Sequence, residues 1–232
     1  MTAVKDHLRR RLKSTIIASG LKPSRHFHYF NALLKLGRWR RQNPSAQHLP
    51  TREALFDAIQ AEVDQPIDYL EFGVFEGKSI AHWAQINPYP ESRFFGFDGF
   101  TGLPEPWVTG STTFARHHFS TGGKEPALDD GRVSFIKGLF QETLPAFLEA
   151  FRPQNRLVVH FDADLYNSTL YGLCRLHPFL VPGSFLIFDD FSVATHDFQA
   201  FYDYAQSHRR AYRVAATAEM GCEILALEML QG

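Results

Sequence analysis

The sequence predicts an α/β fold in which a mostly parallel β-sheet is covered by helices on both faces. Short, near-continuous apolar runs alternate with helical segments after Pro66, and this alternation is typical of parallel sheets buried on both sides. The last two apolar runs are separated only by "AEMG". That gap is too short for a crossover helix, so it predicts an antiparallel hairpin at the C-terminal edge of the sheet.

Each element follows from the local pattern of apolar residues and turn residues. The predicted strands cover 67–72, 93–97, 133–137, 157–162, 184–189, 212–217 and 222–228. The predicted helices cover 51–63, a segment after Gly77, and the segments around 141–151, 168–180 and 197–208. The polar stretch "RQNPSAQHLPTRE" (41–53) contains two prolines and predicts a linker. We therefore divide the chain into a basic helical N-terminal extension or cap, 1–66, and a main domain, 67–232.

Composition excludes several classes of protein. The chain has 232 residues, of which 44% are hydrophobic, so it can bury one sizeable core and is not disordered as a whole. No apolar stretch approaches the roughly 20 residues of a membrane span, and charges interrupt the N-terminal segment where a signal peptide would be apolar. Two cysteines, Cys174 and Cys222, are too few for a disulfide framework. These features predict a cytoplasmic protein.

Charge is distributed unevenly along the chain. Residues 1–41 contain eleven Lys or Arg residues and one acid, although the net charge of the whole chain is -1. Such a basic arm suits nucleic acid, anionic lipid, or packing against an acidic body. Apolar residues recur at helical spacing at Val4, Leu8, Leu12 and Ile16, which favours packing and argues against a nucleic-acid arm. An amphipathic helix at a membrane surface stays open as an alternative.

The glycine-containing loop in "DYLEFGVFEGKS" (68–79) follows the first strand of the alternation. It is one residue too short for a phosphate-binding P-loop, and its glycine spacing does not match the dinucleotide fingerprint. It matches the E-x-G-x-x-x-G turn of proteins that bind S-adenosylmethionine (SAM). Glycines there let the backbone approach a ligand where a helix begins. The predicted cofactor-binding residues in this loop are Glu71, Phe72, Gly73, Gly77 and Ser79.

The next two strand ends add further cofactor candidates. Asp98, followed by Gly99, stands about 25 residues after the first glycine, where an acid can accept both hydroxyls of a ribose. After the following strand, "KGLFQETLP" places Gly138 and Phe140 where an adenine ring would lie. A turn-capping role for Asp98 and a plain turn at Gly138 are the structural alternatives.

Four carboxylates follow two consecutive strands in "HFDADLYNSTLYG" (160–172) and "FDD" (188–190). Consecutive strands joined by one helix are usually neighbours, so we expect these acids to share one edge of the sheet. Two like charges about 4 Å apart repel by roughly 4 kcal/mol at an effective dielectric near 20. Protons or a cation must offset that repulsion, and oxygen ligands suit Mg2+ or Ca2+. The residues concerned are Asp162, Asp164, Asp189 and Asp190.

A D-x-D sequence also occurs in glycosyltransferases, where it holds a nucleotide sugar through a metal. That alternative does not explain the glycine loop, Asp98 or the D-D pair. A non-catalytic domain of the same fold, acting through its basic arm, is the second alternative.

Five stretches together resemble the macrocin O-methyltransferase type of SAM-dependent methyltransferases, which methylate sugar hydroxyls on antibiotics. They are "YLEFGVFEGKS", "GFDGFTGLPEPW", "KGLFQETLP", "HFDADLYNSTLYGL" and "VPGSFLIFDDF", in that order, over about residues 67–192. The resemblance implies a Rossmann-like class I fold for 67–232, and SAM and a divalent metal as cofactors. The metal would usually be Mg2+, with Ca2+ or Mn2+ as alternatives.

The resemblance also implies roles for single residues. It implies that Asp162, Asp189 and Asp190 bind the metal and that Asp164 is the general base on the hydroxyl of a small-molecule acceptor. His196 is a second candidate base or acceptor contact, with an ordinary surface histidine as the alternative. The N-terminal helices would cover the site or pair subunits in a homodimer, and no nucleic-acid partner is expected. Gly99 stands where relatives often have Ser, and "FSVATHDFQAFYDYA" lacks a turn found in many members, so the acceptor is the least defined part.

Overall fold

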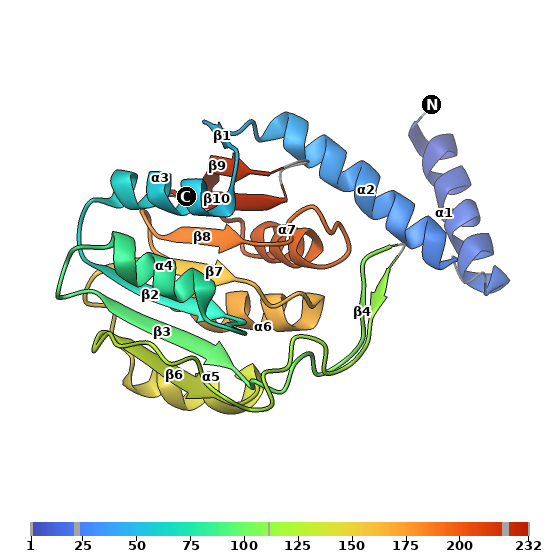
Figure 1. Cartoon of the computed structure of the whole chain (residues 1–232). Coiled ribbons are helices and arrows are strands. Elements are labelled where there is room, and N and C mark those ends of the chain that lie inside the picture. The colour runs from blue at the N-terminus through green and yellow to red at the C-terminus, as the bar shows by residue number, and fades with distance from the viewer. Residues whose placement is uncertain (1, 21–23, 111, 220–222, 232) are drawn as a thin grey trace.

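The apolar runs form the central strands of one sheet, because strands covered by helices on both faces must be apolar along their whole length. The computed structural model describes residues 2–20, 24–110, 112–219 and 223–231. These residues form an eight-stranded sheet in the order β1-β9-β10-β8-β7-β2-β3-β6 (Figure 1). The strands are β1 (His48–Leu49), β2 (Ile67–Phe72), β3 (Arg93–Asp98), β6 (Val133–Lys137), β7 (Arg156–Phe161), β8 (Phe185–Phe188), β9 (Tyr212–Ala218) and β10 (Ile224–Met229).

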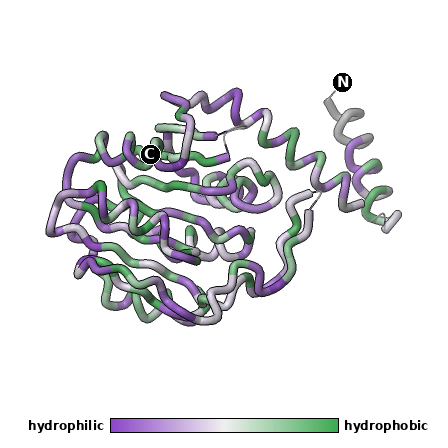
Figure 2. Tube along the Cα trace, in the orientation of Figure 1, coloured by the Kyte–Doolittle hydropathy of each residue, from purple (hydrophilic) through white to green (hydrophobic). Residues whose placement is uncertain are grey.

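The strand directions confirm the predicted sheet. Strands β8, β7, β2, β3 and β6 pair in parallel, whereas β10 is antiparallel to both β8 and β9. A separate two-stranded ribbon, β4 (Trp107–Val108) and β5 (Thr113–Phe114), projects from the segment after β3 toward α2 (Figure 1). All residues of β2 and β8 are buried, and Figure 2 shows hydrophobic stretches along the central strands.

Helices cover both faces of the sheet. They are α1 (Thr2–Ser19), α2 (Arg25–Gln42), α3 (Arg52–Val63), α4 (Lys78–Ile86), α5 (Phe140–Ala150), α6 (Tyr166–Leu176) with a 3-10 turn at His177–Phe179, and α7 (Asp197–Ser207). Apolar side chains of α3 and α4 share one buried cluster with the sheet. Side chains of α5, α6 and α7 share the other. The sheet is therefore the middle layer of three, as the alternation of strands and helices predicts.

The segment 41–53 is more ordered than a linker. Helix α2 continues to Gln42, and His48–Leu49 forms β1, which pairs in parallel with β9. The prediction of a plain linker is therefore wrong for these residues, and the C-terminal hairpin is covered at its outer side by β1. The physical reason is that β9 would otherwise present unpaired backbone groups, which proteins usually cover.

Of the two N-terminal helices, α2 packs against the rest of the chain. Ala32, Leu36 and Trp39 of α2 are buried, and the Trp39 ring packs against the rings of Phe191, Phe198, Phe201 and Tyr212. Of the predicted stripe on α1, Leu12 and Ile16 are exposed, while the side chains of Val4 and Leu8 lie outside the described residues. The division at residue 66 stays a prediction.

The structure also bears on membrane-spanning helices and on the two cysteines. In the described part of the chain, no helix is both long enough and apolar enough to cross a membrane. Cys174 is a free, exposed thiol, and Cys222 lies outside the described residues.

Candidate functional site

Four stacked phenylalanines mark the level at which four neighbouring strands end and the site begins. Phe97, Phe72, Phe161 and Phe188 are in register on β3, β2, β7 and β8. Their ring centroids are 4.9, 5.1 and 5.4 Å apart, and neighbouring ring planes differ by at most 15°. Cross-strand aromatic pairs of this kind stabilise strand register. The register brings the residues that follow, 98, 73, 162 and 189, to one edge of the sheet.

Gly73 joins the glycine loop to the first acid of the edge. Its φ is +90°, and a Cβ built on it would lie 1.8 Å from the carbonyl oxygen of Asp162. Only glycine fits such a close approach of two backbones in this conformation. The glycine that the cofactor motif requires therefore also places that loop directly against the strand end that carries the carboxylates.

Asp98 ties the same loop to β3. Its Oδ2 accepts hydrogen bonds from the backbone N–H groups of Val74 and Phe75, both at 2.8 Å, and its Oδ1 accepts one from Phe100 N–H at 2.7 Å. Asp98 also lines the cavity described below. A carboxylate has about four acceptor positions, so the turn-capping role and a hydrogen bond from a ribose hydroxyl are compatible.

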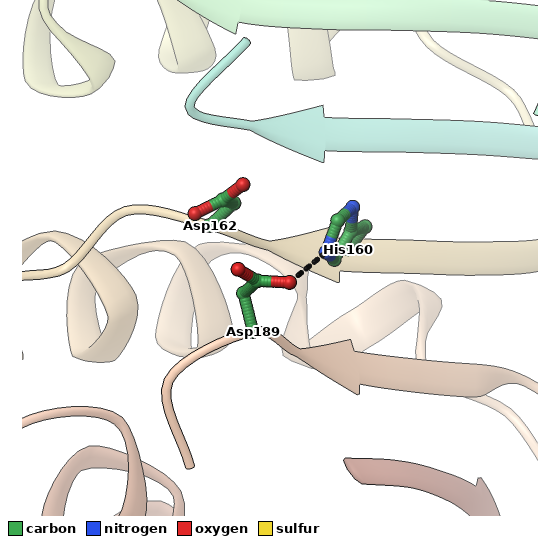
Figure 3. Close-up of side chains that lie close together, drawn as sticks. All are labelled: His160, Asp162 and Asp189. Carbon is green, nitrogen blue, oxygen red and sulfur yellow. Dashed lines mark ion pairs between the residues drawn. The ribbon is translucent and has the colours of Figure 1, made fainter. Parts of the chain in front are cut away.

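The four carboxylates come together as the sequence predicts, in two overlapping groups. Asp162, Asp164 and Asp190 each place a carboxylate oxygen within 4.8 Å of the others, and Asp162, Asp189 and His160 form the second group. Figure 3 shows Asp162 and Asp189 at the ends of β7 and β8, beside the His160 ring. Asp164 has a φ of +59°, a conformation that costs energy for a residue other than glycine and is concentrated at functional sites.

Two cationic side chains share this edge, and neither was assigned a role from the sequence. Arg52, the first residue of α3, places Nη2 2.5 Å from Asp189 Oδ2 and Nη1 3.7 Å from Asp162 Oδ2. His160 is fully buried in β7, with Nε2 3.7 Å from Asp189 Oδ1. The sequence contained a signal for each. A histidine interrupts an apolar strand, and an arginine begins a helix, where the helix dipole disfavours a cation.

The Glu71 carboxylate is buried beside His160. It is 1% exposed and accepts a hydrogen bond of 2.5 Å from the Tyr69 hydroxyl. The Tyr69 oxygen lies 3.0 Å from His160 Nδ1, and Glu71 Oε2 lies 3.7 Å from that nitrogen. Glu71 and His160 are register partners on β2 and β7. A buried chain of polar groups therefore runs from Tyr69 and Glu71 of β2, through His160, to Asp189.

The charges raise several pKa values at this edge. Burial opposes a charge on His160, but attraction to Asp189 and Glu71 outweighs burial and raises the pKa of His160 to about 10. Burial, followed by the charges of Asp162 and Asp190, raises the pKa of Asp164 to about 10. Burial and the Asp189 charge raise the pKa of Asp190 to about 6. Burial and Asp189 also raise the pKa of Asp162, against the opposite influence of His160 and Arg52. Without a further cation, burial and the neighbouring acids therefore favour the protonated form of Asp164.

A cavity of about 470 Å³ opens on the same edge, within the usual size range of small-molecule sites. Nine of the predicted residues line it: Gly73, Asp98, Gly99, Gly138, Phe140, Asp162, Asp164, Asp189 and Asp190. Four predicted cofactor residues lie outside the lining. Phe72 belongs to the phenylalanine row and Gly77 caps α4. Ser79 is buried beside Arg52, and Glu71 is bonded as described.

Aromatic and apolar side chains also line the cavity, and the sequence assigned them no function. They are Phe75, Leu103, Trp107 and Phe119. Trp107 stacks on Phe114 across the β4–β5 ribbon with ring centroids 4.9 Å apart. Phe75 and Phe119 meet edge to face at 5.8 Å, and both have positive φ. Trp107 stands in "GLPEPW" and Phe75 in the glycine loop, so sequence proximity to the motifs was the available signal.

His196 lies outside the cavity lining. Its Nδ1 accepts a hydrogen bond from the backbone N–H of Tyr166 at 3.1 Å, and its Nε2 lies 3.0 Å from the carbonyl oxygen of Val108. Burial lowers the pKa of His196. Both ring nitrogens are therefore engaged by the backbone in the neutral form. These two contacts favour a structural role for His196, in which the ring joins the β4–β5 ribbon to α6. The catalytic role of His196 stays a prediction.

Comparison with known proteins identifies the family. Residues 47–216 match the family described as macrocin O-methyltransferase (TylF). Over 191 residues, 68% of this chain and 70% of the relative, the chain is 31% identical to the 8-demethyl-8-(2,3-dimethoxy-alpha-L-rhamnosyl)-tetracenomycin-C 4'-O-methyltransferase of Streptomyces olivaceus. It is also 31% identical to the mycinamicin III 3''-O-methyltransferase of Micromonospora griseorubida, over 51% of this chain and 41% of that enzyme.

Solved structures show the same fold. The calicheamicin methyltransferase CalS11 superimposes with a TM-score of 0.57 at 19% identity, covering 90% of this chain and 94% of that one. The fold, the glycine loop, the acidic strand ends and a family match that spans most of the chain agree with one another. The chain therefore belongs to the macrocin O-methyltransferase (TylF) family of class I SAM-dependent O-methyltransferases.

Proposed function

We propose that the chain transfers the methyl group of SAM to a hydroxyl of a sugar on a natural product, with a divalent cation at the acidic edge. One observation supports this most: a single cavity is lined by Gly73, Asp98 and Gly138 of the cofactor loops and by the carboxylates of β7 and β8. Methyl donor and acceptor hydroxyl must meet in such a space. The relative from Streptomyces olivaceus is named for a rhamnosyl-bearing tetracenomycin, which supports the same class of acceptor.

Family membership decides between the alternatives left by the sequence. It favours a methyltransferase over a glycosyltransferase that uses D-x-D for a nucleotide sugar, and over a non-catalytic domain that acts through its basic arm. The apolar wall of the cavity, with Trp107 and Phe119, suits the ring and aglycone of a glycosylated acceptor, because small-molecule sites combine apolar walls with a few polar groups.

The donor set fits a hard divalent cation. Asp162, Asp164 and Asp190 converge within 4.8 Å through oxygen atoms alone, and Asp189 Oδ1 is buried without a hydrogen bond. The proposed ligands are Asp162, Asp189 and Asp190, and Mg2+ is the favoured ion. The structure groups these residues differently: Asp164 converges with Asp162 and Asp190, whereas Asp189 groups with Asp162 and His160. His160, with its raised pKa, has no free lone pair for a metal in its protonated form. When bound, the cation would lower the pKa of the acceptor hydroxyl.

The residues of the chain then perform three tasks. Asp164 takes the proton of the acceptor hydroxyl, and the oxygen attacks the methyl carbon of SAM as the carbon–sulfur bond breaks and S-adenosylhomocysteine leaves. Gly73, Asp98 and Gly138 hold the cofactor, and Phe75, Trp107 and Phe119 exclude water and orient the acceptor. Because burial and neighbouring acids raise the pKa of Asp164, a cation at the edge would lower that pKa and favour the base form.

A chelator test separates the parts of this proposal. The purified chain is incubated with SAM and a panel of glycosylated natural products and free sugars, and methylated product is detected by mass spectrometry. We expect turnover with Mg2+, loss of turnover in excess EDTA and recovery on adding Mg2+. Full activity in excess chelator would contradict the metal, and SAM binding without any methylated sugar would contradict the acceptor class.

We also propose that the N-terminal helices pair two copies of the chain. The described parts of α1 and α2 expose large apolar side chains, namely Leu12, Ile16, Ile17, Phe27, Phe30, Leu33 and Leu34. Such a surface is costly in water unless it is covered. Sedimentation velocity should show a dimer at micromolar concentration that dissociates when Phe30 and Leu34 are changed to Ser; a monomeric wild-type chain would refute the pairing. A cytoplasmic location stays a prediction.

A further inference from the structure

Arg52 occupies the acidic edge in a way that affects the proposed metal. Its side chain lines the cavity, is 33% exposed and contacts two of the three proposed ligands. The contact to Asp189 is short, with Nη2 2.5 Å from Oδ2, whereas the contact to Asp162 is longer, at 3.7 Å. The guanidinium therefore already holds Oδ2 of Asp189, while Oδ1 of the same carboxylate faces His160 Nε2 at 3.7 Å.

Helix α3 delivers Arg52 to this place. Thr51 caps the helix by accepting a hydrogen bond from Ala54 N–H, and Arg52 is the first helical residue. A cation is disfavoured at a helix N-terminus, so attraction to the carboxylates must outweigh that cost. The rest of α3 is fixed by the buried Leu55, Phe56 and Ile59, which leaves the long Arg52 side chain as the movable part.

Arg52 forms a hydrogen bond with only one of the two carboxylate oxygens of Asp189. Asp189 Oδ1 and His160 Nε2 are both buried without a hydrogen bond, 3.7 Å apart. Polar atoms buried without a hydrogen bond are rare in folded proteins, because leaving the bond unmade costs free energy. A partner that reached both oxygens of Asp189 would complete the site better than the guanidinium does.

We propose that Arg52 is a displaceable counter-ion, which neutralises Asp189 and Asp162 in the metal-free enzyme and leaves Asp189 when a divalent cation binds. This inference rests on the metal in the proposed function. A magnesium ion binds carboxylate oxygen at about 2.0–2.1 Å, and a guanidinium nitrogen 2.5 Å from the same oxygen would repel it strongly. A cation that binds Asp189 through Oδ2 must therefore displace Arg52.

Calorimetric titration with Mn2+ and with Mg2+ tests the inference on the full chain. Wild type is compared with Arg52→Gln, which removes the charge, and with Arg52→Lys, which retains it. We expect Arg52→Gln to bind Mn2+ about tenfold more tightly or better, and Arg52→Lys to stay near wild type. Arg213→Gln is the matched control. Arg213 pairs with Glu62 and Glu228 away from the cavity, so its loss should leave metal affinity unchanged.

The outcomes distinguish the two proposals. A wild-type chain that binds neither ion would overturn the metal in the proposed function. A wild-type chain that binds metal, together with an Arg52→Gln variant that binds it equally or less tightly, would overturn the counter-ion role alone. SAM affinity and thermal unfolding confirm that the variant is folded.

A measurement on the wild-type chain covers the case in which Arg52→Gln fails to fold. The side-chain 15Nε–1Hε resonance of Arg52, assigned by its loss in Arg52→Lys, should shift as Mg2+ is added, while that of Arg213 should not. An Arg52 resonance that stays in place at saturating Mg2+ would overturn displacement.

Discussion

Buried carboxylates lie at both ends of the central strands, and their surroundings differ. At the start of β2, Asp68 is fully buried and accepts two hydrogen bonds from Arg93 at 2.8 and 2.7 Å. It accepts further bonds from the backbone N–H groups at 154 and 155 and from the Asn155 amide. At the end of β8, Asp189 is also buried, but one of its oxygens binds Arg52 and the other has no hydrogen bond.

The difference shows how a structural acid can be distinguished from a functional one. A buried charge that only stabilises the fold needs all of its hydrogen bonds, because each missing one costs free energy. At the carboxyl edge, bonds are left unmade and four acids share two cations, so the site retains capacity for a ligand. The cavity opens on this edge, as expected for parallel sheets, in which ligands bind at the carboxyl ends of strands.

Removing the proposed base should give the largest effect. Asp164→Asn keeps the shape of the side chain but cannot take a proton, so kcat should fall by about 10³-fold, while SAM affinity stays nearly the same. Initial rates and calorimetry with SAM measure the two quantities. Asp203→Asn is the control, since Asp203 bonds Tyr166 away from the cavity lining. An Asp164→Asn variant with wild-type turnover would show that the base is another group.

Changing the structural acid should affect stability instead of chemistry. Asp68→Asn leaves Arg93 without its counter-charge. The side-chain NH2 group of the new asparagine would also face N–H donors that Asp68 accepts from. The free energy of unfolding should therefore fall by about 3–5 kcal/mol. Urea unfolding measures it. Glu76→Gln, at the exposed Glu76–Lys78 pair, should change stability by less than about 0.5 kcal/mol. If Asp68→Asn and Glu76→Gln lowered the free energy of unfolding equally, the structural role of Asp68 would be contradicted.

The stability of the folded chain should depend on pH through the buried acid Asp197. Burial, opposed by its hydrogen bond with Thr169, raises the pKa of Asp197 from 3.8 to about 7. The folded state thus holds its proton more tightly than the unfolded state. The stability from this group is complete below pH 4 and is lost as the pH rises toward 7, at about 1.4 kcal/mol per unit.

Asp197→Asn should remove this loss. In excess chelator, the variant and wild type should be similarly stable near pH 4, and the variant should become relatively more stable up to pH 7 and stay so above it. Chemical unfolding at several pH values measures the difference. A constant difference across that range would mean that Asp197 does not titrate with folding.

The smallest effect is expected at the cap of α3. Thr51→Ala removes the hydrogen bond to Ala54 N–H and should cost about 1 kcal/mol of stability. Because the cap positions the first turn, the change should also weaken the hold of Arg52 on Asp189 without removing its charge. Urea unfolding measures the first effect and Mn2+ titration the second, where an affinity lower than that of wild type would contradict the counter-ion model.

Much of the fold could be predicted because its signals are local. Apolar runs, glycines after strands and polar segments mark the strands and helices within a few residues of each boundary, and the short "AEMG" gap predicted the hairpin. The proximity of Asp162, Asp164 and Asp190 followed from the rule that consecutive parallel strands are neighbours. The two-residue strand β1 has no such signal, because it exists only through its pairing with β9.

The sequence by itself determined which residues could do the chemistry: a glycine loop, an acid at 98 and four acids at two strand ends. Only the tertiary structure decided how they are oriented and paired. Glu71 is absent from the cavity lining, and strand register places it beside His160. Arg52 reaches Asp189 across 137 positions in the chain. Local patterns are set by neighbours in sequence, whereas charge balance at a sheet edge depends on which distant segments the packed core brings together.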